Sequence, residues 1–180
     1  MKKALLVCAL LVLGFSACTS SGGGGFRLLM QDLPVDMDHV WITFAEISLY
    51  QENGDFKSYE TKDAQGDSLR VDLLALRNNN LGTIFNGTVD SGIYEQLRLV
   101  VTKATYVAMG DTTETEVDLF VPSGEVKITV IFEVTAGSLT EVTVDFDAEK
   151  SIQAHDTGSG KHILRPVVTV VKVVPPPATT

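Results

Sequence analysis

The sequence predicts an all-β protein, a single antiparallel β-sandwich of about eight or nine strands with little helix. Apolar residues recur at every second position through much of the chain, which is the period of a half-buried strand. Pairs such as Asn53-Gly54 and Ser123-Gly124 separate these runs and suit tight turns. A helical pattern is confined to single turns around residues 75–79 and 148–151. A closed barrel is the alternative architecture.

The strongest alternation lies in residues 126–134, "VKITVIFEV", where only Ile131 interrupts the polar side. Residues 139–146, "LTEVTVDF", alternate in the same way. Antiparallel strands with one buried face show this pattern. The remaining strands are expected at residues 26–31, 40–49, 56–59, 69–74, 94–103, 116–121 and 163–174.

The expected strand over residues 40–49 changes its apolar side half-way along. Its apolar residues occupy even positions up to Phe44 and odd positions from Ile47 onward. A step of odd length inside a strand turns the side chains over unless a β-bulge absorbs it. We therefore expect a bulge near Ala45-Glu46.

The first residues have the layout of a secretory signal. Lysines follow Met1, and residues 4–14 form an apolar stretch of eleven residues, too short to span a bilayer as a stable helix. The following "GFSACTS" resembles the lipobox of bacterial lipoproteins, although Phe15 stands where that pattern usually has Leu. In such proteins a diacylglycerol is attached to the cysteine before cleavage in front of it. The resemblance implies a signal peptide over residues 1–17 and a lipid on Cys18, and the alternative is ordinary cleavage that leaves a free thiol.

The charge of the mature chain restricts its partners. Cleavage before Cys18 removes two of the 14 basic residues, so 12 remain against 23 acidic residues and the net charge changes from −9 to −11. Such a surface repels nucleic acid and anionic head groups. We expect no nucleic-acid partner, and a domain that stands off the membrane to which its lipid attaches it. Because Thr19 follows the cysteine, the lipobox resemblance implies an outer-membrane location if the host cell has such a membrane.

The chain divides into a tether, one domain and a tail. Residues 18–25 carry the expected lipid and a run of four glycines, which makes a flexible tether. Residues 26–174 suffice for one sandwich domain. Residues 175–180 begin with three prolines, which cannot continue a sheet. The single cysteine of the mature chain carries the lipid, so we expect stability to come from packing or from a bound ion rather than from a disulfide.

Four blocks of sequence carry a resemblance that covers nearly the whole mature chain. They are "QDLPVDMDHVWITFAEISL", "VDLLALRN", "GIYEQLRLVV" and "TVDFDAEKSI…HILRPVV", in that order. Together they resemble a family of bacterial and archaeal lipoproteins that share domain of unknown function 4382. The resemblance implies an exported, usually lipid-anchored β-domain of the immunoglobulin-like or transthyretin-like kind, without an assigned activity or catalytic residue. The residues of these blocks that we single out are Asp32, Pro34, Asp72, Gly92, Tyr94, Arg98, Lys150 and Pro166.

Several of these residues also have a physical interpretation of their own. Gly92 can take a positive φ where the chain turns into a strand. Tyr94 can lay its ring on the edge of the sandwich and form a hydrogen bond through its hydroxyl. Arg98 alternates with leucines, so it points to solvent or pairs with an acid such as Asp72. Pro166 predicts an edge position or a bulge for the last strand. We expect structural roles for Gly92, Tyr94 and Arg98.

The segment "VDFDAEKSIQ" gathers the acids that most resemble a site. Its apolar residues Val144 and Phe146 face the core in the expected strand, so Asp145 and Asp147 are expected together on the outer face. Their spacing suits a two-carboxylate hydrolase. A flat outer face, however, offers no cleft that would raise the pKa of either acid. This segment therefore disfavours an enzyme.

The same acids are weak candidates for calcium. Asp145, Asp147 and Glu149 fall at positions 1, 3 and 5 of a calcium-loop pattern, but Lys150 stands at position 6, where the turn requires glycine. The preferred interpretation is that the strand ends here, that Lys150 neutralises a neighbouring acid and that Ser151 caps the turn. No other metal or cofactor is expected. The three histidines lack the spacing of a zinc site.

The sequence thus predicts an exported, membrane-anchored and non-catalytic β-sandwich module. Its expected role is binding or structural, at the cell envelope, with a protein or glycan as the partner. The alternative is a hydrolase, or an accessory domain of a hydrolase, that acts in the periplasm or on the cell surface. The fold alone does not choose between them, because function depends on the site.

Overall fold

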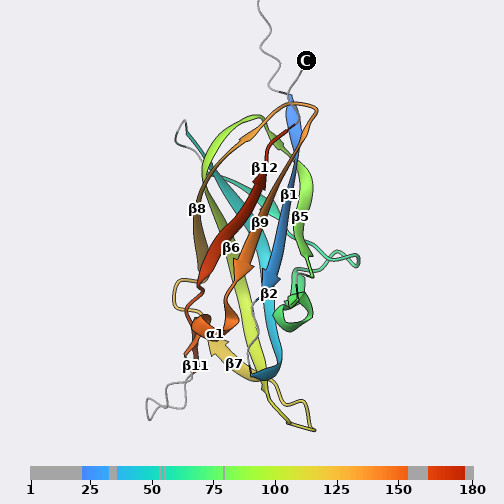
Figure 1. The fold of residues 1–180 in the computed structure, drawn as a ribbon, viewed down its shortest axis with the longest axis vertical. Helices are drawn as coiled ribbons and strands as arrows, with labels where there is room; N and C mark the ends of the chain where they lie inside the picture. Colours follow the sequence, from blue (N-terminus) through green and yellow to red (C-terminus); the bar gives the residue numbers. More distant parts are fainter. Residues whose placement is uncertain are drawn as a thin grey trace, which may run out of the picture.

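The computed structural model describes residues 22–32, 36–52, 54, 56–78, 80–153 and 162–176. Two β-sheets pack face to face and form a sandwich (Figure 1). The all-β prediction is confirmed, and the closed alternative is wrong because the two sheets stay separate in the described part of the chain. Helix is limited there to two four-residue elements, η1 (Leu73–Leu76) and α1 (Ala148–Ser151).

The smaller sheet contains four strands. Their spatial order is β12 (Val168–Val174), β9 (Leu139–Phe146), β1 (Gly23–Asp32) and β5 (Gly82–Asp90). Strands β1 and β9 run parallel, whereas the other two pairings are antiparallel. The sheet is therefore mixed, which the prediction of an antiparallel sandwich did not include.

The larger sheet contains eight strands and is built on a long central pair, β2 (Met37–Gln51) and β6 (Gly92–Ala108). Strands β3 (Phe56–Glu60) and β4 (Leu69–Asp72) pair with successive parts of β2. On the other side, β8 (Glu125–Val134) and β7 (Val117–Phe120) pair with successive parts of β6. Beyond β7 lie β11 (His162–Leu164) and β10 (Ile152–Gln153).

The core lies between the two sheets. Phe132 stacks on Phe26 and Tyr94, with ring centroids 5.0 and 5.2 Å apart, and so joins β8 to both sheets. Val144 and Phe146 are fully buried, as their alternation predicts. The alternation in β8 is also confirmed, including the exception at Ile131, which is 72% exposed.

The predicted bulge in β2 is confirmed. Phe44 pairs with Val101 and Glu46 pairs with Val100, so Ala45 has no partner in the ladder with β6. The bulge leaves Ala45 and Glu46 together on the outer side, between the buried Phe44 and the next buried residue of β2. The inward face of the strand is thereby kept along its whole length.

Three features of the chain differ from the prediction. Residues 23–25, expected in the flexible tether, form the start of β1 and pair with the end of β5, so the domain begins before residue 26. Strand β5 was not predicted, because its buried residues Ile84 and Val89 are five positions apart and show no strand period. The expected strand over residues 163–174 is divided at residues 165–167, where the chain passes from the larger sheet to the smaller one. Pro166 lies in this connection, and β12 beyond it forms an edge of the smaller sheet, so the predicted edge position is confirmed but the continuity is wrong.

The described chain begins and ends at the same end of the sandwich. Strands β1 and β9 run in one direction and β12 returns, so Val174 pairs with Glu141 close to the start of β1. Figure 1 shows this end at the top, with α1, β7 and β11 at the opposite end. Within the described ranges, neither helix has the length or the apolar composition needed to span a bilayer.

Candidate functional site

The acidic segment at the end of β9 is more enclosed than the sequence suggested. Asp145 is 8% exposed and Asp147 is 6% exposed, so the expectation of two acids on an open outer face is wrong. Asp145 accepts a hydrogen bond of 2.8 Å from the amide of Gln31. Thr169 of β12 pairs with it from the other side, and this strand reaches the segment only after the connection at Pro166.

Asp147 ends β9 and caps α1. Its Oδ1 accepts the backbone N–H of Lys150 at 3.0 Å, and its Oδ2 forms an ion pair with the Lys150 ammonium at 2.5 Å. Burial by itself raises the pKa of Asp147, but the two hydrogen bonds and the charge of Lys150 outweigh it, so the pKa lies below its usual value. Ser151 donates its hydroxyl to the Asp147 carbonyl and accepts the N–H of Val167 at 2.8 Å. These contacts agree with the preferred interpretation of a strand end with a capped turn.

The other calcium candidate, Glu149, is exposed. Within the described ranges, no three His, Cys, Asp or Glu side chains gather closely enough to hold a metal ion.

Of the remaining predicted residues, Asp32 is 4% exposed and its Oδ1 accepts the N–H of Ala148 at 3.1 Å, which ties the end of β1 to α1. Cys18 and Pro34 lie outside the described residues.

Gly92 and Tyr94 form a structural motif at the start of β6. Gly92 has a φ of 149°, and a Cβ there would lie 2.9 Å from the amide nitrogen of Gln51, so glycine is required. Tyr94 is fully buried rather than laid on the edge of the sandwich. Its hydroxyl donates to the Asp90 carbonyl at 2.7 Å and accepts from Gln51 at 3.2 Å, which confirms the predicted hydrogen bonding. Burial raises the pKa of this hydroxyl.

Arg98 points outward, so its pairing with Asp72 is wrong. Its Nε donates to Gln96 at 3.0 Å, its Nη1 lies 3.6 Å from Glu125, and its guanidinium carbon lies 4.0 Å from the centre of the Phe56 ring. The side chain is therefore held on three sides while 28% of it stays exposed. It belongs to the outer face of the larger sheet.

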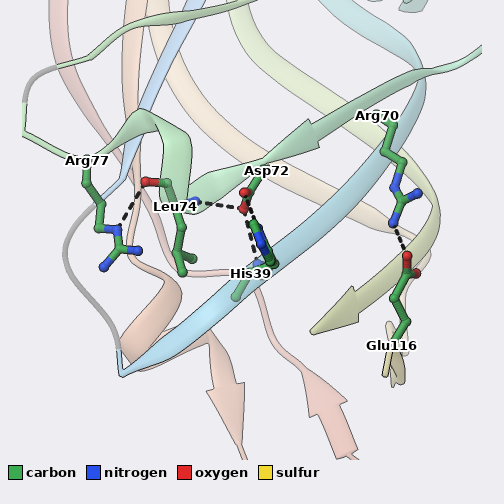
Figure 2. Close-up of polar contacts among 7 residues, drawn as sticks. His39, Arg70, Asp72, Leu74, Arg77 and Glu116 are labelled. Atoms are coloured by element: carbon green, nitrogen blue, oxygen red, sulfur yellow. Dashed lines mark hydrogen bonds and ion pairs between the residues drawn. The ribbon is translucent and has the colours of Figure 1, made fainter. Parts of the chain in front are cut away.

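Asp72 instead organises the junction of β2, β4 and η1 (Figure 2). Its Oδ1 accepts the backbone N–H groups of Leu74 and Val40 at 3.1 and 3.2 Å, and its Oδ2 accepts Nδ1–H of His39 at 2.7 Å. The first bond caps η1, and the second satisfies a strand N–H. The bond to Asp72 raises the pKa of His39 above its usual 6.5, against a smaller effect of burial.

His39 is the first member of a stack on the outer face. Its ring lies 5.5 Å from the ring of Trp41, and the guanidinium carbon of Arg70 lies 4.5 Å from that ring. Arg70 also pairs with Glu116 at 2.6 Å, as Figure 2 shows, and this bond lowers the pKa of Glu116. Asp72, His39, Trp41, Arg70 and Glu116 come from β2, β4 and the segment before β7, and we call them the Trp41 cluster.

A second group of aromatic and polar side chains lies further along the same face. Phe56, Tyr50, Gln96 and Thr129 form one row across β3, β2, β6 and β8. Together with Glu95 and Arg98 they line a shallow depression of about 470 Å³, which we call the Phe56 depression. A larger depression of about 620 Å³ lies near the tether end, between Lys57 and Asp90, but those two side chains pair with each other.

Neither group was predicted as a group from the sequence, although Asp72 and Arg98 were singled out individually. A usable signal was present for the Trp41 cluster, because the only tryptophan of the chain stands on the polar side of a strand, two residues after a histidine. The cluster offers an oriented imidazole with a raised pKa, an indole ring and one guanidinium group. Among the described residues, no serine, threonine or cysteine contacts His39 as a nucleophile would.

Comparison with curated proteins and with solved structures found no match. A family model for a domain of unknown function, DUF4382, matches residues 23–166. The match begins at β1 and ends at the connection between β11 and β12, so it includes the Trp41 cluster, the Phe56 depression and the acidic segment. The chain therefore belongs to the DUF4382 family.

Proposed function

We propose that the chain is an exported, lipid-anchored and non-catalytic β-sandwich module with a binding or structural role at the cell envelope. The observation that carries this proposal is that the two ends of the sandwich differ. The described chain enters and leaves at one end, whereas the Trp41 cluster begins two residues into β2, close to the opposite end. A lipid on Cys18 would hold the first end at the membrane and direct the second end away from it.

The nature of the outer face supports binding. Tryptophan, tyrosine and arginine are enriched where proteins meet their partners, and this face displays all three in stacked and ion-paired arrangements. Such contacts hold the side chains in place before a partner arrives, which lowers the entropic cost of binding. The net charge of −9, or −11 after the proposed cleavage, favours a protein or glycan partner over nucleic acid.

Cell fractionation tests the anchor. The wild-type chain should sediment with membranes, in the outer membrane if the host has one, and should carry the mass of a lipid on Cys18. Cys18→Ala should release the domain into the soluble fraction. Membrane association of that variant, or a wild-type chain without lipid, would refute the anchor.

Thiol labelling tests the orientation. The mature chain has no cysteine other than the lipidated one, so an introduced cysteine is the only free thiol. In intact envelopes a bulky maleimide should react with Met109→Cys, next to the end of β6 and 62% exposed in the wild type. It should react much less with Ala136→Cys, which is also exposed in the structure and lies beside the start of β1. Equal labelling of the two sites would contradict the proposed orientation, in which the end of the domain that carries Met109 points away from the membrane.

A hydrolase or hydrolase-accessory domain is the second candidate, and the oriented His39–Asp72 pair is the observation that favours it. An imidazole held by a carboxylate can accept a proton from a substrate or from water. Under this alternative, His39→Ala and Asp72→Asn would each abolish hydrolysis of model esters and glycosides by the purified chain. Under the binding proposal the wild-type chain shows no such hydrolysis.

A further inference from the structure

The Phe56 depression has a lining that is aromatic on one side and polar on the other. Phe56 is 41% exposed, and its ring lies 4.8 Å from the ring of Tyr50 at a tilt of 45°. Around this pair stand an amide, a carboxylate, a guanidinium and a hydroxyl, which belong to Gln96, Glu95, Arg98 and Thr129. A small number of convergent polar groups beside aromatic rings is typical of a small-molecule site.

A second β-bulge builds the polar side of this depression. Tyr94 pairs with Phe132, and Gln96 pairs with Thr129, so Glu95 stands opposite two residues of β8. Both Glu95 and Gln96 are half-buried between the buried Tyr94 and the next buried residue, so both lie on the outer side of β6. A regular strand would place only one of them there. Bulges of this kind often occur where a side chain is re-aimed at a site.

Arg98 is already positioned at the depression. Gln96, Glu125 and the Phe56 ring hold its guanidinium from three directions, and among the described residues only the Nε–H is used in a hydrogen bond shorter than 3.5 Å. The remaining N–H groups of a guanidinium are donors in a fixed plane. A partner that accepts from them need not order the side chain first.

The chemistry of the lining selects the class of partner. Carboxylate oxygens only accept hydrogen bonds, guanidinium N–H groups only donate, and amides and hydroxyls do both. A sugar hydroxyl also does both, so hydroxyls of a saccharide can donate to Glu95 and accept from Arg98, while its C–H groups contact the part of the aromatic pair that Arg98 leaves exposed. Glu95 and Glu125 beside the single arginine disfavour an anionic partner, as does the net charge of the whole chain.

We propose that the Phe56 depression binds a neutral saccharide. This inference rests on the proposed function as a binding module, and it names the ligand class and the side chains involved. The exposed part of the aromatic pair supplies apolar contact, Glu95 and Arg98 supply directional hydrogen bonds, and Gln96 holds Arg98 and offers its amide N–H₂ group.

Calorimetric titration of the lipidated full-length chain in nanodiscs tests the proposal. The probes are cellohexaose, maltohexaose and chitohexaose, with hexagalacturonic acid as the anionic comparison. At least one neutral probe should bind, and hexagalacturonic acid should bind more weakly. Arg98→Ala and Glu95→Gln should each weaken binding of that probe about tenfold, as expected for one lost charge-assisted hydrogen bond.

Arg27→Ala is the matched control. Arg27 also pairs with a glutamate, Glu141 at 2.7 Å, and is 37% exposed, but it lies on the smaller sheet. Its removal should leave binding unchanged, and circular dichroism should give the same β-spectrum for all variants. The proposal fails if no neutral probe binds, if hexagalacturonic acid binds best, or if Arg98→Ala and Arg27→Ala have equal effects. If the saccharide does not bind but Cys18 still anchors the chain, the saccharide proposal is refuted and the proposal of a membrane-anchored module is not.

Discussion

Two aspartates of this protein end a strand and cap a short helix, yet they make different structures. Asp72 ends β4 and caps η1, and Asp147 ends β9 and caps α1. Asp147 is bound by the ammonium of Lys150, three positions along the chain, whereas Asp72 is bound by the imidazole of His39, 33 positions away. The first is a local motif, and the second exists only after β2 and β4 have paired.

This difference in the origin of the two contacts makes Asp72, rather than Asp147, the acid to examine for a role in function. The contacts of Asp147 serve the end of its own strand and the connection at Val167, and its carboxylate is 8% exposed. The contacts of Asp72 fix His39 beside Trp41, on a face that solvent reaches. A local cap can arise wherever a strand must stop, whereas a cluster assembled from distant segments brings several kinds of side chain to one place. The following predictions test this distinction, from the largest expected effect to none.

Asp72→Ala should destabilise the protein most. It removes the cap of η1 and leaves the N–H of Val40 without its acceptor, and together these losses should cost about 2–4 kcal/mol in the free energy of unfolding. Urea unfolding measures the change. Asp72→Asn keeps one oxygen as an acceptor and should lose less. If Asp72→Ala lowers the free energy of unfolding no more than Asp147→Ala does, the two aspartates do not differ in their structural contribution.

Asp147→Ala should cost about 1 kcal/mol, the usual value of a helix cap. Lys150→Ala should change the free energy of unfolding much less than Asp147→Ala does, because the lysine side chain is 70% exposed and an exposed pair contributes little. The same urea experiment compares the two variants. Equal losses would mean that the ion pair rather than the cap carries the contribution of Asp147.

His39 and Asp147 should contribute to stability in different pH ranges. The pKa of His39 is raised by Asp72, so its stabilising contribution is complete below pH 6.5 and is lost as the pH rises through the raised value. The pKa of Asp147 is lowered, so its contribution is present above pH 3.8 and is lost as the pH falls through the lowered value. Both effects should be small, below about 1 kcal/mol, because one partner in each pair is exposed to solvent.

Variants separate the two windows. His39→Gln should flatten the stability profile between about pH 6 and pH 8, the usual range of histidine titration, and leave the acid limb unchanged. Asp147→Asn should flatten only the acid limb. Urea midpoints measured across the pH range check both, and a His39→Gln profile that keeps the wild-type slope near neutrality would exclude this role for the histidine.

Calcium should have no effect on thermal unfolding. The Asp147 carboxylate is engaged by Lys150 and the Asp145 carboxylate by Gln31, which leaves Glu149 as the exposed acid. A bound ion at a hundredfold excess over its dissociation constant would add about 2.7 kcal/mol, several degrees for a domain of this size. A calcium-dependent shift that is absent in a variant with both Asp145→Asn and Asp147→Asn would establish an ion site here.

Alternation predicted most strands because a sandwich with one solvated face imposes that period. It predicted the bulge in β2, the limits of β9 and the turn at α1. It missed β5 because Gly82 and Gly87 carry no side chain to mark a face. The other errors have one common cause: each depends on the pairing of segments that are distant in the sequence, which a local pattern does not contain.

The burial of Asp145 illustrates this limit. The alternation of β9 indicates only that Asp145 points away from the core. The strand that pairs beside it is β12, which reaches the smaller sheet after the chain has left the larger one, and no local sequence pattern predicts that passage. The Trp41 cluster has the same origin. The period of β2 places His39 and Trp41 on one side, but Arg70 and Glu116 arrive through β4 and the approach to β7.

The parallel pairing of β1 with β9 has a consequence for how the chain matures. Arg27 and Glu141 are separated by 114 positions, so β1 obtains this neighbour only after most of the chain has been made. Contacts of such long range slow folding and leave strand edges uncovered in the meantime. Under the proposed export the N-terminal strand would emerge first, with β5 as its earliest partner in the smaller sheet. If the chain is exported as proposed, we expect folding to finish only when the last strands have crossed the membrane, and the emerging chain to depend on protection from aggregation until then.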